Sequence, residues 1–326
     1  MNRVLVTGGA GSIGAAVVRR LLRDPNYEVR VSDRREAPTW MREGCEVHTG
    51  DLRQLSEARK ATAGCSHVVH LAAMVRGIGS VHRTPHTLME VNHEVSSAVM
   101  RAALDRGLER FVYVSSNTVL ERATVFPTPE SHLADCPPPH GADGISKLFG
   151  ELAVRAAHAE HGLPFTICRP FSVYGPGELP AEEAGVAHVV PDLVGKALER
   201  TVPLPIFGSG RQTRTPTFVD DAADGIVVAM AAPEGLDEDF NVCGGREVTV
   251  AELAAIVWAA CGHDPEALEL APAAPFAFDA ERSAPSPAKA RDRLGWTAPT
   301  PLEAGIATTV AWLRERIGAS PATVPA

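Results

Sequence analysis

Three glycines near the start of the sequence have the type and spacing of a phosphate-binding turn. Gly8, Gly11 and Gly14 lie between a β-branched run, Val4–Val6, and an apolar run typical of a helix, Ala15–Val18. Glycine lets the backbone approach an anion closely, and the N–H groups and positive dipole end of the following helix attract it. A glycine turn between a strand and a helix favours dinucleotide binding over an ordinary tight turn.

An aspartate stands at the position where dinucleotide-binding chains contact the adenosine ribose. Asp33 comes directly after the next apolar run, Val29–Ser32. Its carboxylate can accept hydrogen bonds from both ribose hydroxyls and would repel a 2′-phosphate, so the sequence favours NAD over NADP. Arg34 and Arg35 could pair with such a phosphate, but two solvated charges after a strand are the simpler interpretation.

Asp143 and Lys147 are a second pair whose types and spacing could do chemistry. They stand four residues apart in a segment predicted to be helical, which places both side chains on one helix face. The positive charge of the lysine favours the ionised form of a nearby carboxyl group. The pair can act on a ligand together, or Asp143 can simply be the ion-pair partner of Lys147.

A parallel sheet must position these residues, because strands and helices alternate through the first half of the chain. Long helices are predicted over Pro85–Arg106 and Gly144–His161. Ligands bind at the carboxyl ends of the strands in a doubly wound sheet. The residues predicted at those ends are Asp33, Asp51, Ala72, Ala73, Ser115, Ser116, Arg169 and Pro170.

The second half of the chain is less regular. Helices are expected over Val189–Arg200 and Val248–Cys261, and Pro272–Pro287 is predicted to be a loop. We therefore predict an α/β protein whose Rossmann-type, doubly wound parallel sheet is joined to a smaller, interrupted α/β substrate domain. The predicted ranges are 1–170 plus about 217–243 for the NAD-binding domain, about 171–216 and 244–316 for the substrate-binding domain, and 317–326 for a flexible tail.

Composition limits the class of protein and of ligand. Of the 326 residues 45% are hydrophobic and 22% charged, as in ordinary globular proteins. The net charge of −9 argues against a nucleic-acid partner. The six cysteines are scattered, so we expect reduced thiols in a cytoplasmic protein and no metal site. No apolar run reaches the roughly 18 residues that suggest a membrane span.

Beyond the glycine turn, several short motifs resemble those of one family. They are Asp51-Leu52, His70-Leu71-Ala72-Ala73, Val114-Ser115-Ser116, Val173-Tyr174-Gly175-Pro176, Val219-Asp220-Asp221 and Leu294-Gly295-Trp296. Together with Lys147 and Arg214, they make the chain similar to the extended short-chain dehydrogenase/reductase family, in its NAD-dependent epimerase/dehydratase branch. Within that branch the chain resembles GDP-mannose 3,5-epimerases most and GDP-L-fucose synthases more distantly.

The resemblance implies bound NAD, a nucleotide-activated sugar as substrate, with a weak preference for a GDP sugar, and a homodimer formed through the two long helices. The cofactor-binding residues that it implies are Gly8, Gly11, Ser12, Ile13, Gly14, Asp33, Arg34, Asp51, Leu52, Leu71, Ala72, Ala73, Asn92, Ser115, Lys147 and Pro170. The implied substrate-binding residues are Gly77, Ser116, Ser172, His188, Arg214 and Arg282. The implied catalytic residues are Ser116, Thr118, Asp143, Lys147 and His188.

Three positions depart from the family pattern. The family's catalytic pair is Tyr-x-x-x-Lys, in which the tyrosinate takes a hydroxyl proton as hydride leaves for NAD, and Asp143 stands in place of that tyrosine. A carboxylate is about six pKa units less basic than a phenolate, and Tyr113 and Tyr174 match other family positions. Thr118 replaces the catalytic cysteine of the epimerase, and Ser172 replaces an asparagine that contacts substrate.

These departures leave two mechanisms open for an epimerase-like enzyme. In one, transient oxidation still occurs, with Asp143, through water, or another group as base. In the other, the substrate already carries a ketone, and His188, which matches an acid/base histidine of the fucose synthases, exchanges the neighbouring C–H proton. The second needs no tyrosine, so the departures favour it. The alternative functions are a catalytically inactive NAD-binding protein and a same-fold enzyme for a non-nucleotide secondary metabolite.

Overall fold

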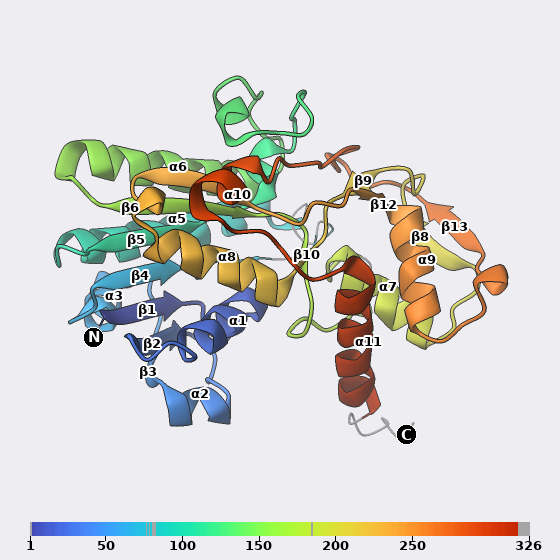
Figure 1. The fold of residues 1–326 in the computed structure, drawn as a ribbon, viewed down its shortest axis with the longest axis horizontal. Coiled ribbons are helices and arrows are strands. Elements are labelled where there is room, and N and C mark those ends of the chain that lie inside the picture. The colour runs from blue at the N-terminus through green and yellow to red at the C-terminus, as the bar shows by residue number, and fades with distance from the viewer. Residues whose placement is uncertain (1, 76, 78, 80–82, 184, 319–326) are drawn as a thin grey trace.

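The computed structural model describes residues 2–75, 77, 79, 83–183 and 185–318. A seven-stranded sheet lies at its centre, and all neighbouring strands in it are parallel. In spatial order the strands are β11 (Glu238–Val242), β6 (Phe165–Pro170), β5 (Arg110–Val114), β4 (His67–His70), β1 (Asn2–Thr7), β2 (Tyr27–Asp33) and β3 (Glu46–Thr49). The strand order runs outward from β1 in both directions, which confirms the predicted doubly wound sheet (Figure 1).

Helices cover both faces of this sheet (Figure 1). Those on one face are α3 (Leu55–Thr62), α5 (Pro85–Leu104) and α6 (Ala142–His161), and those on the other are α1 (Ser12–Leu21), α8 (Val219–Ala231) and α10 (Ala288–Leu294). The short helix α2 (Thr39–Gly44) lies beside β3. Side chains of β1 alternate between the two cores, since Leu5 packs with the first set of helices and Val4 and Val6 with the second.

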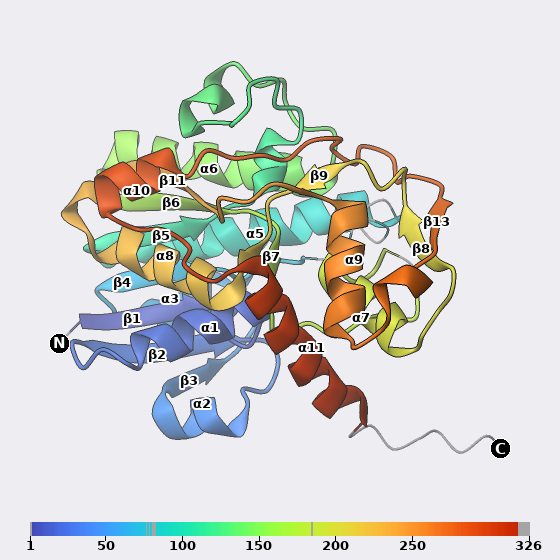
Figure 2. The same ribbon diagram turned by 45° about the vertical axis from the view of Figure 1, so that its right-hand side comes forward.

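A second, smaller region lies beyond the carboxyl ends of the sheet strands, where Figure 2 shows α7, α9 and α11 grouped together. Its helices are α7 (Val189–Leu198), α9 (Val250–Ala260) and α11 (Leu302–Gly318). Its strands form two-stranded sheets and are β7 (Val173–Tyr174) with β10 (Thr217–Phe218), β9 (Thr213–Arg214) with β12 (Val248–Thr249), and β8 (Leu204–Phe207) with β13 (Leu270–Ala273). The described 3-10 helices are η1 (Asn117–Leu120), η2 (Glu130–Ala134), η3 (Pro233–Gly235) and η4 (Pro265–Ala267).

The predicted long helices are confirmed as α5, which ends two residues earlier than predicted, and α6, which begins two residues earlier. The loop predicted over Pro272–Pro287 is wrong at its start, because Pro272 and Ala273 pair with β8 as part of β13. The tail predicted to be flexible begins too early, since 317 and 318 belong to α11, while 319–326 lie outside the described residues. None of the helices in the described part of the chain has the length and apolar composition that crossing a bilayer requires.

Candidate active site

A cavity of about 930 Å³ opens where the carboxyl ends of the sheet strands face the smaller region. It brings together every cofactor-binding, substrate-binding and catalytic residue that the resemblance implies. These are Gly8, Gly11, Ser12, Ile13, Gly14, Asp33, Arg34, Asp51, Leu52, Leu71, Ala72, Ala73, Gly77, Asn92, Ser115, Ser116, Thr118, Asp143, Lys147, Pro170, Ser172, His188, Arg214 and Arg282. Arg169, predicted at the same strand ends, is buried and does not line the cavity. Among the described residues, no three His, Cys, Asp or Glu side chains are grouped as a metal site.

The glycine turn lies at one end of this cavity and has room for a phosphate but not for side chains. Gly8 has a φ of +68°, and a Cβ there would lie 2.9 Å from the backbone of Ala72. A Cβ on Gly14 would lie 2.3 Å from the carbonyl oxygen of Gly8. Helix α1 begins after Gly11, which has no side chain to cap the first-turn N–H groups. These donors and the helix dipole fit the pyrophosphate of a dinucleotide.

Asp33 is fixed beside this turn at the end of β2. One carboxylate oxygen accepts from the N–H of Ala10 at 3.1 Å, and the other accepts from the N–H of Arg35 at 2.9 Å. The Asp33 side chain is 10% exposed, whereas Arg35 is 65% exposed and folds back to pair with it. Arg35 is therefore a partner of the carboxylate, and the arrangement suits ribose hydroxyls rather than a 2′-phosphate.

The opposite wall of the cofactor end is shaped by contacts within the protein. The hydroxyl oxygen of Thr7 accepts from the N–H groups of Leu71 and Ala72, each at 3.1 Å. Asn92, buried on α5, accepts from the N–H of Met74 at 2.6 Å and donates to its carbonyl at 3.2 Å. Asn92 thus holds the backbone that lines the cavity.

Lys147 lies on the floor of the cavity, on α6. Its Nζ donates to the carbonyl of Val114 at 2.8 Å and lies 5.4 Å from the ring centre of Tyr113. Burial lowers the pKa of Lys147 to about 8, although the charges of Glu151 and Asp143 oppose this shift. Asp143 lies one turn earlier and lines the same cavity. Among the described residues, Lys147 bonds the Val114 carbonyl and forms no ion pair with Asp143.

None of the chain's three tyrosines, all within the described residues, takes the place of the family's catalytic phenol. Tyr113 is 2% exposed, and its hydroxyl is packed so closely on α6 that a Cβ on Gly150 would lie 1.9 Å away. Tyr174 donates its hydroxyl to the carbonyl of Leu302 at 3.2 Å. Burial raises the pKa of both phenols. Tyr27 begins β2 and so lies at the end of that strand away from Asp33.

Two hydroxyl groups form a polar patch on the cavity wall after β5. The Ser116 oxygen accepts from the hydroxyl of Thr118 at 3.0 Å and from its N–H at 3.2 Å. Ser116 donates its own hydrogen to the side-chain oxygen of Asn117 at 3.3 Å. A threonine hydroxyl is too weak an acid to replace a thiol in proton exchange, so this patch can orient a carbonyl or hydroxyl group but not deprotonate carbon.

His188 faces the cavity at the start of α7, and the structure supplies the partner that the sequence did not reveal. Its Nδ1 lies 2.8 Å from Oε1 of Glu178, which also accepts from the His188 N–H at 2.9 Å. Burial lowers the pKa of His188, but the hydrogen bond and charge of Glu178, with the charge of Asp143, raise it to a net value above normal. Burial raises the pKa of Glu178, but His188 lowers it to a net value below normal.

Glu178→Gln is expected to lower the pKa of His188, because it removes the charge that stabilises the imidazolium ion. The raised pKa means that His188 stabilises the fold below its ordinary pKa of 6.5 and loses this contribution as the pH rises through the folded value. Titration of the imidazole C2–H signal by NMR, assigned with His188→Asn, measures the shift. Glu160→Gln, at a surface pair with His161, is the matched control and should leave His188 unchanged.

Two arginines proposed for the substrate phosphates already have carboxylate partners. Arg214 is 15% exposed and pairs with Asp279, and it also donates to the carbonyl of Ala280 at 2.8 Å. Arg282 makes two bonds of 2.8 Å to the carboxylate of Glu247. The two chain segments lie side by side, because Thr213 and Arg282 are bridged through their backbones. A diphosphate must share or displace these carboxylates.

Gly77 and Ser172 shape the cavity wall through their backbones. The N–H of Gly77 donates to the carbonyl of Val186 at 2.9 Å, and a Cβ there would lie 2.4 Å from the carbonyl oxygen of Gly185. Gly77 therefore supports the segment that leads to His188. Ser172 has a φ of +42°, a conformation in which asparagine is several-fold enriched, so the family's asparagine at this position would fit the backbone better than serine does.

Sequence reasoning missed the acidic partners of the site, namely Glu178, Glu247 and Asp279. Glu178 follows the Val173–Pro176 motif in a glycine-rich turn, and no spacing in the sequence relates it to a histidine ten residues later. Asp279 lies 65 residues from Arg214. Only the folded chain brings these charges together, so the sequence carried no signal for them beyond the presence of acidic residues in predicted loops.

Comparison with known proteins agrees with this geometry. A model of the NAD dependent epimerase/dehydratase family matches residues 4–243. UDP-glucose 4-epimerase of Mycolicibacterium smegmatis is 31% identical over 328 residues, which cover 96% of this chain and 99% of that protein. GDP-mannose 3,5-epimerase 1 of Oryza sativa subsp. japonica is 27% identical over 319 residues, which cover 97% and 82%.

Solved structures give the same assignment. The crystal structure of UDP-glucose 4-epimerase from Thermotoga maritima with UDP-glucose is similar with a TM-score of 0.86 and 29% identity, covering 97% of this chain and 99% of that chain. The match of fold and sequence extends through both the sheet and the smaller region. The chain therefore belongs to the NAD dependent epimerase/dehydratase family, whose cofactor is NAD.

Proposed function

We propose that this protein is an NAD-dependent enzyme that epimerises a nucleotide-activated sugar. We also propose that His188 exchanges the C–H proton of the carbon that inverts, since the family's catalytic tyrosine is absent. One observation carries the proposal. The His188–Glu178 pair faces the same cavity as Lys147, Asp143 and Ser116, whereas Tyr174, the tyrosine among the lining residues, donates its hydroxyl to the carbonyl of Leu302. The family and its relatives support an enzyme of this class.

The cofactor fits the glycine end of the cavity. Gly8, Gly11 and Gly14 would cradle its pyrophosphate, Asp33 would accept from the adenosine ribose, and Lys147 would donate to the nicotinamide ribose. Bound NAD can accept a hydride from a sugar carbon and return it. The remainder of the cavity, between Ser116 and Arg214, is where we propose that the sugar and its diphosphate bind, against the smaller substrate-binding region.

In the favoured mechanism the substrate carries a ketone next to the carbon that inverts. Because Nδ1 of His188 must donate its hydrogen to the Glu178 carboxylate, Nε2 is the free acceptor in the neutral ring. Nε2 takes the C–H proton, and the electron pair moves to the carbonyl oxygen to give an enolate. Ser116 can redirect its hydrogen to that oxygen. A solvent proton, relayed through a water at Asp143, adds to the opposite face, and His188 releases the proton that it removed to solvent, which completes the inversion.

Incubation with 4-keto nucleotide sugars in D2O tests this proposal. We expect deuterium at the carbon beside the carbonyl, detected by mass spectrometry and NMR, together with a mixture of epimers. An epimerised product without solvent label would contradict the His188 mechanism and favour the transient oxidation, with Asp143 acting through water. Absence of any turnover, with NAD still bound, would favour a catalytically inactive member of the family.

A second candidate is an enzyme that acts on a non-nucleotide secondary metabolite. The observation that favours it is the pairing of Arg214 with Asp279 and of Arg282 with Glu247, which leaves neither guanidinium free for a diphosphate. Titration with GDP, UDP, dTDP and CDP separates the two proposals. Binding of any of them supports a nucleotide sugar, and the nucleotide that binds most tightly shows whether the expected preference for GDP is correct. No binding favours the second candidate.

We also propose that the protein is a cytoplasmic homodimer. The long helices α5 and α6 carry exposed apolar side chains on adjacent turns, including Met89, Phe149 and Leu152, of which Leu152 is 59% exposed. Such a face is typical of a subunit interface. All six cysteines are free thiols, which suits a reducing compartment.

A further inference from the structure

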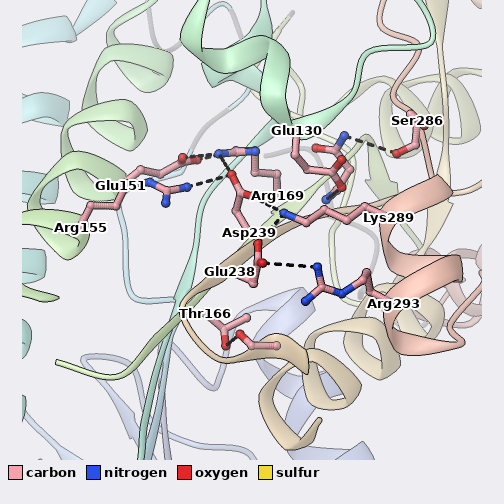
Figure 3. A network of polar contacts seen from close by, with 12 residues as sticks. Glu130, Glu151, Arg155, Thr166, Arg169, Glu238, Asp239, Ser286, Lys289 and Arg293 are labelled. Carbon is pink, nitrogen blue, oxygen red and sulfur yellow. Dashed lines mark hydrogen bonds and ion pairs between the residues drawn. The ribbon is translucent and has the colours of Figure 1, made fainter. Parts of the chain in front are cut away.

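A buried network of charges underlies the catalytic end of the cavity, and none of the expected site roles uses it. Its centre is an ion pair between Arg169 of β6 and Glu151 of α6, whose side chains are 0% and 1% exposed. Figure 3 shows both side chains, with Asp239 of β11 on the other side of Arg169. Arg169 bonds Glu151 at 2.6 and 2.8 Å and Asp239 at 2.8 Å.

Glu151 reaches from this network to the strand end that supports Lys147. Its carboxylate accepts from the hydroxyl of Ser115, and Ser115 directly follows Val114, whose carbonyl is the acceptor for Lys147 Nζ. Glu151 also lies one helical turn after Lys147 on the same face of α6. One carboxylate thus contacts the backbone segment that holds the lysine and places a negative charge near its ammonium group.

We propose that Glu151 is a positioning residue for the reaction proposed above, because its buried carboxylate fixes the end of β5 that holds the Lys147 ammonium group and places a negative charge one helical turn from it. The role of Glu151 in the reaction rests on the proposed function, whereas its contacts with Ser115 and Arg169 do not.

The other groups around Lys147 do not replace this charge. On its own helix Asp143 also acts in the same direction, but it lies on the cavity side, where it is free to meet a substrate. From β5 the ring of Tyr113 faces the ammonium group, and burial lowers the pKa of His70 on β4 to about 3, so that His70 is neutral. Arg169 is positive, and its charge is compensated by its bonds to Glu151 and Asp239.

The chain offers a direct measurement of this effect, because it has four lysines, Lys60, Lys147, Lys196 and Lys289. Reductive methylation with ¹³C-formaldehyde labels each amine and leaves one N–H on a dimethylated lysine for the bond to Val114. NMR titration then gives four lysine curves, and Lys147→Arg assigns one. We expect Lys147 to titrate lowest, and Glu151→Gln to lower its midpoint further by about one pH unit.

Asp239→Asn is the matched control, since it removes a carboxylate from the same network on the far side of Arg169. It should leave the Lys147 midpoint in place but lower that of Lys289, which bonds Asp239 at 2.7 Å. If Glu151→Gln does not fold, the double change Glu151→Met with Arg169→Met removes the buried pair as a unit, and the Lys147 midpoint should again fall. An unchanged midpoint in the folded variant would overturn the proposal. These titrations need no substrate, so they test the role of Glu151 even if the protein is not an epimerase.

Discussion

Replacement of His188 by asparagine is expected to slow solvent deuterium incorporation into a 4-keto nucleotide sugar by about 10² to 10⁴ fold, the usual contribution of a general base. Asparagine retains a polar side chain of similar width but cannot take a proton from carbon. Since His188 lies at the start of α7 and is 48% exposed, the change should leave the fold and NAD binding intact. Mass spectrometry of the recovered sugar measures the rate.

Two further variants test whether the slower deuterium incorporation is due to lost proton transfer. Glu178→Gln keeps the imidazole but removes its charged partner, so the loss should be smaller and the pH profile should move to lower pH with the His188 pKa. Asp143→Asn should affect the return of the proton more than its removal. Equal exchange rates in the parent and His188→Asn would show that another group removes the proton.

Asp143→Tyr is expected to give the protein a redox activity that the parent lacks. A phenolate is about six pKa units more basic than a carboxylate, so it can take the hydroxyl proton of a sugar that carries no ketone. Lys147, one turn later on α6, supplies the positive charge that favours the phenolate. Absorbance of reduced nicotinamide at about 340 nm, with UDP-glucose or GDP-mannose added, measures the gain.

Asp143→Phe is the control, because it introduces the ring without the hydroxyl and should remain inactive in this assay. If the parent itself reduces bound NAD with these sugars as fast as Asp143→Tyr does, the tyrosine is dispensable and transient oxidation is the better mechanism. If neither does so although both bind NAD and the sugar, the loss of redox chemistry has causes beyond residue 143.

The fold and the cofactor end of the cavity could be predicted because their signals are local. The β-branched run of β1, the glycines of the turn and the apolar start of α1 follow one another in the sequence, and backbone sterics alone decide what they form. Asp33 was predictable for the same reason, since it ends the next strand of a parallel sheet and all such ends meet at one edge.

The catalytic end was predicted only in part, because its partners lie on segments whose approach depends on tertiary packing. His188 was found through resemblance, but its bond to Glu178 requires the turn after β7 to fold back along the start of α7. The ion pair of Arg214 and the start of β13 both depend on loops of the smaller region. The intrinsic strand propensity of their residues carries little information about such loops, because pairing with a distant strand overrides it.

We propose that one cavity holds NAD against the first helix and presents His188, instead of a tyrosine, to the sugar beside it. A crystal structure of the protein with NAD and a 4-keto nucleotide sugar would show both placements at once. We expect the pyrophosphate at Gly11–Gly14, the nicotinamide ribose on Lys147, and Nε2 of His188 within hydrogen-bond reach of the carbon beside the ketone. A dinucleotide bound elsewhere, or the hydroxyl of Tyr113 or Tyr174 at the sugar, would contradict it.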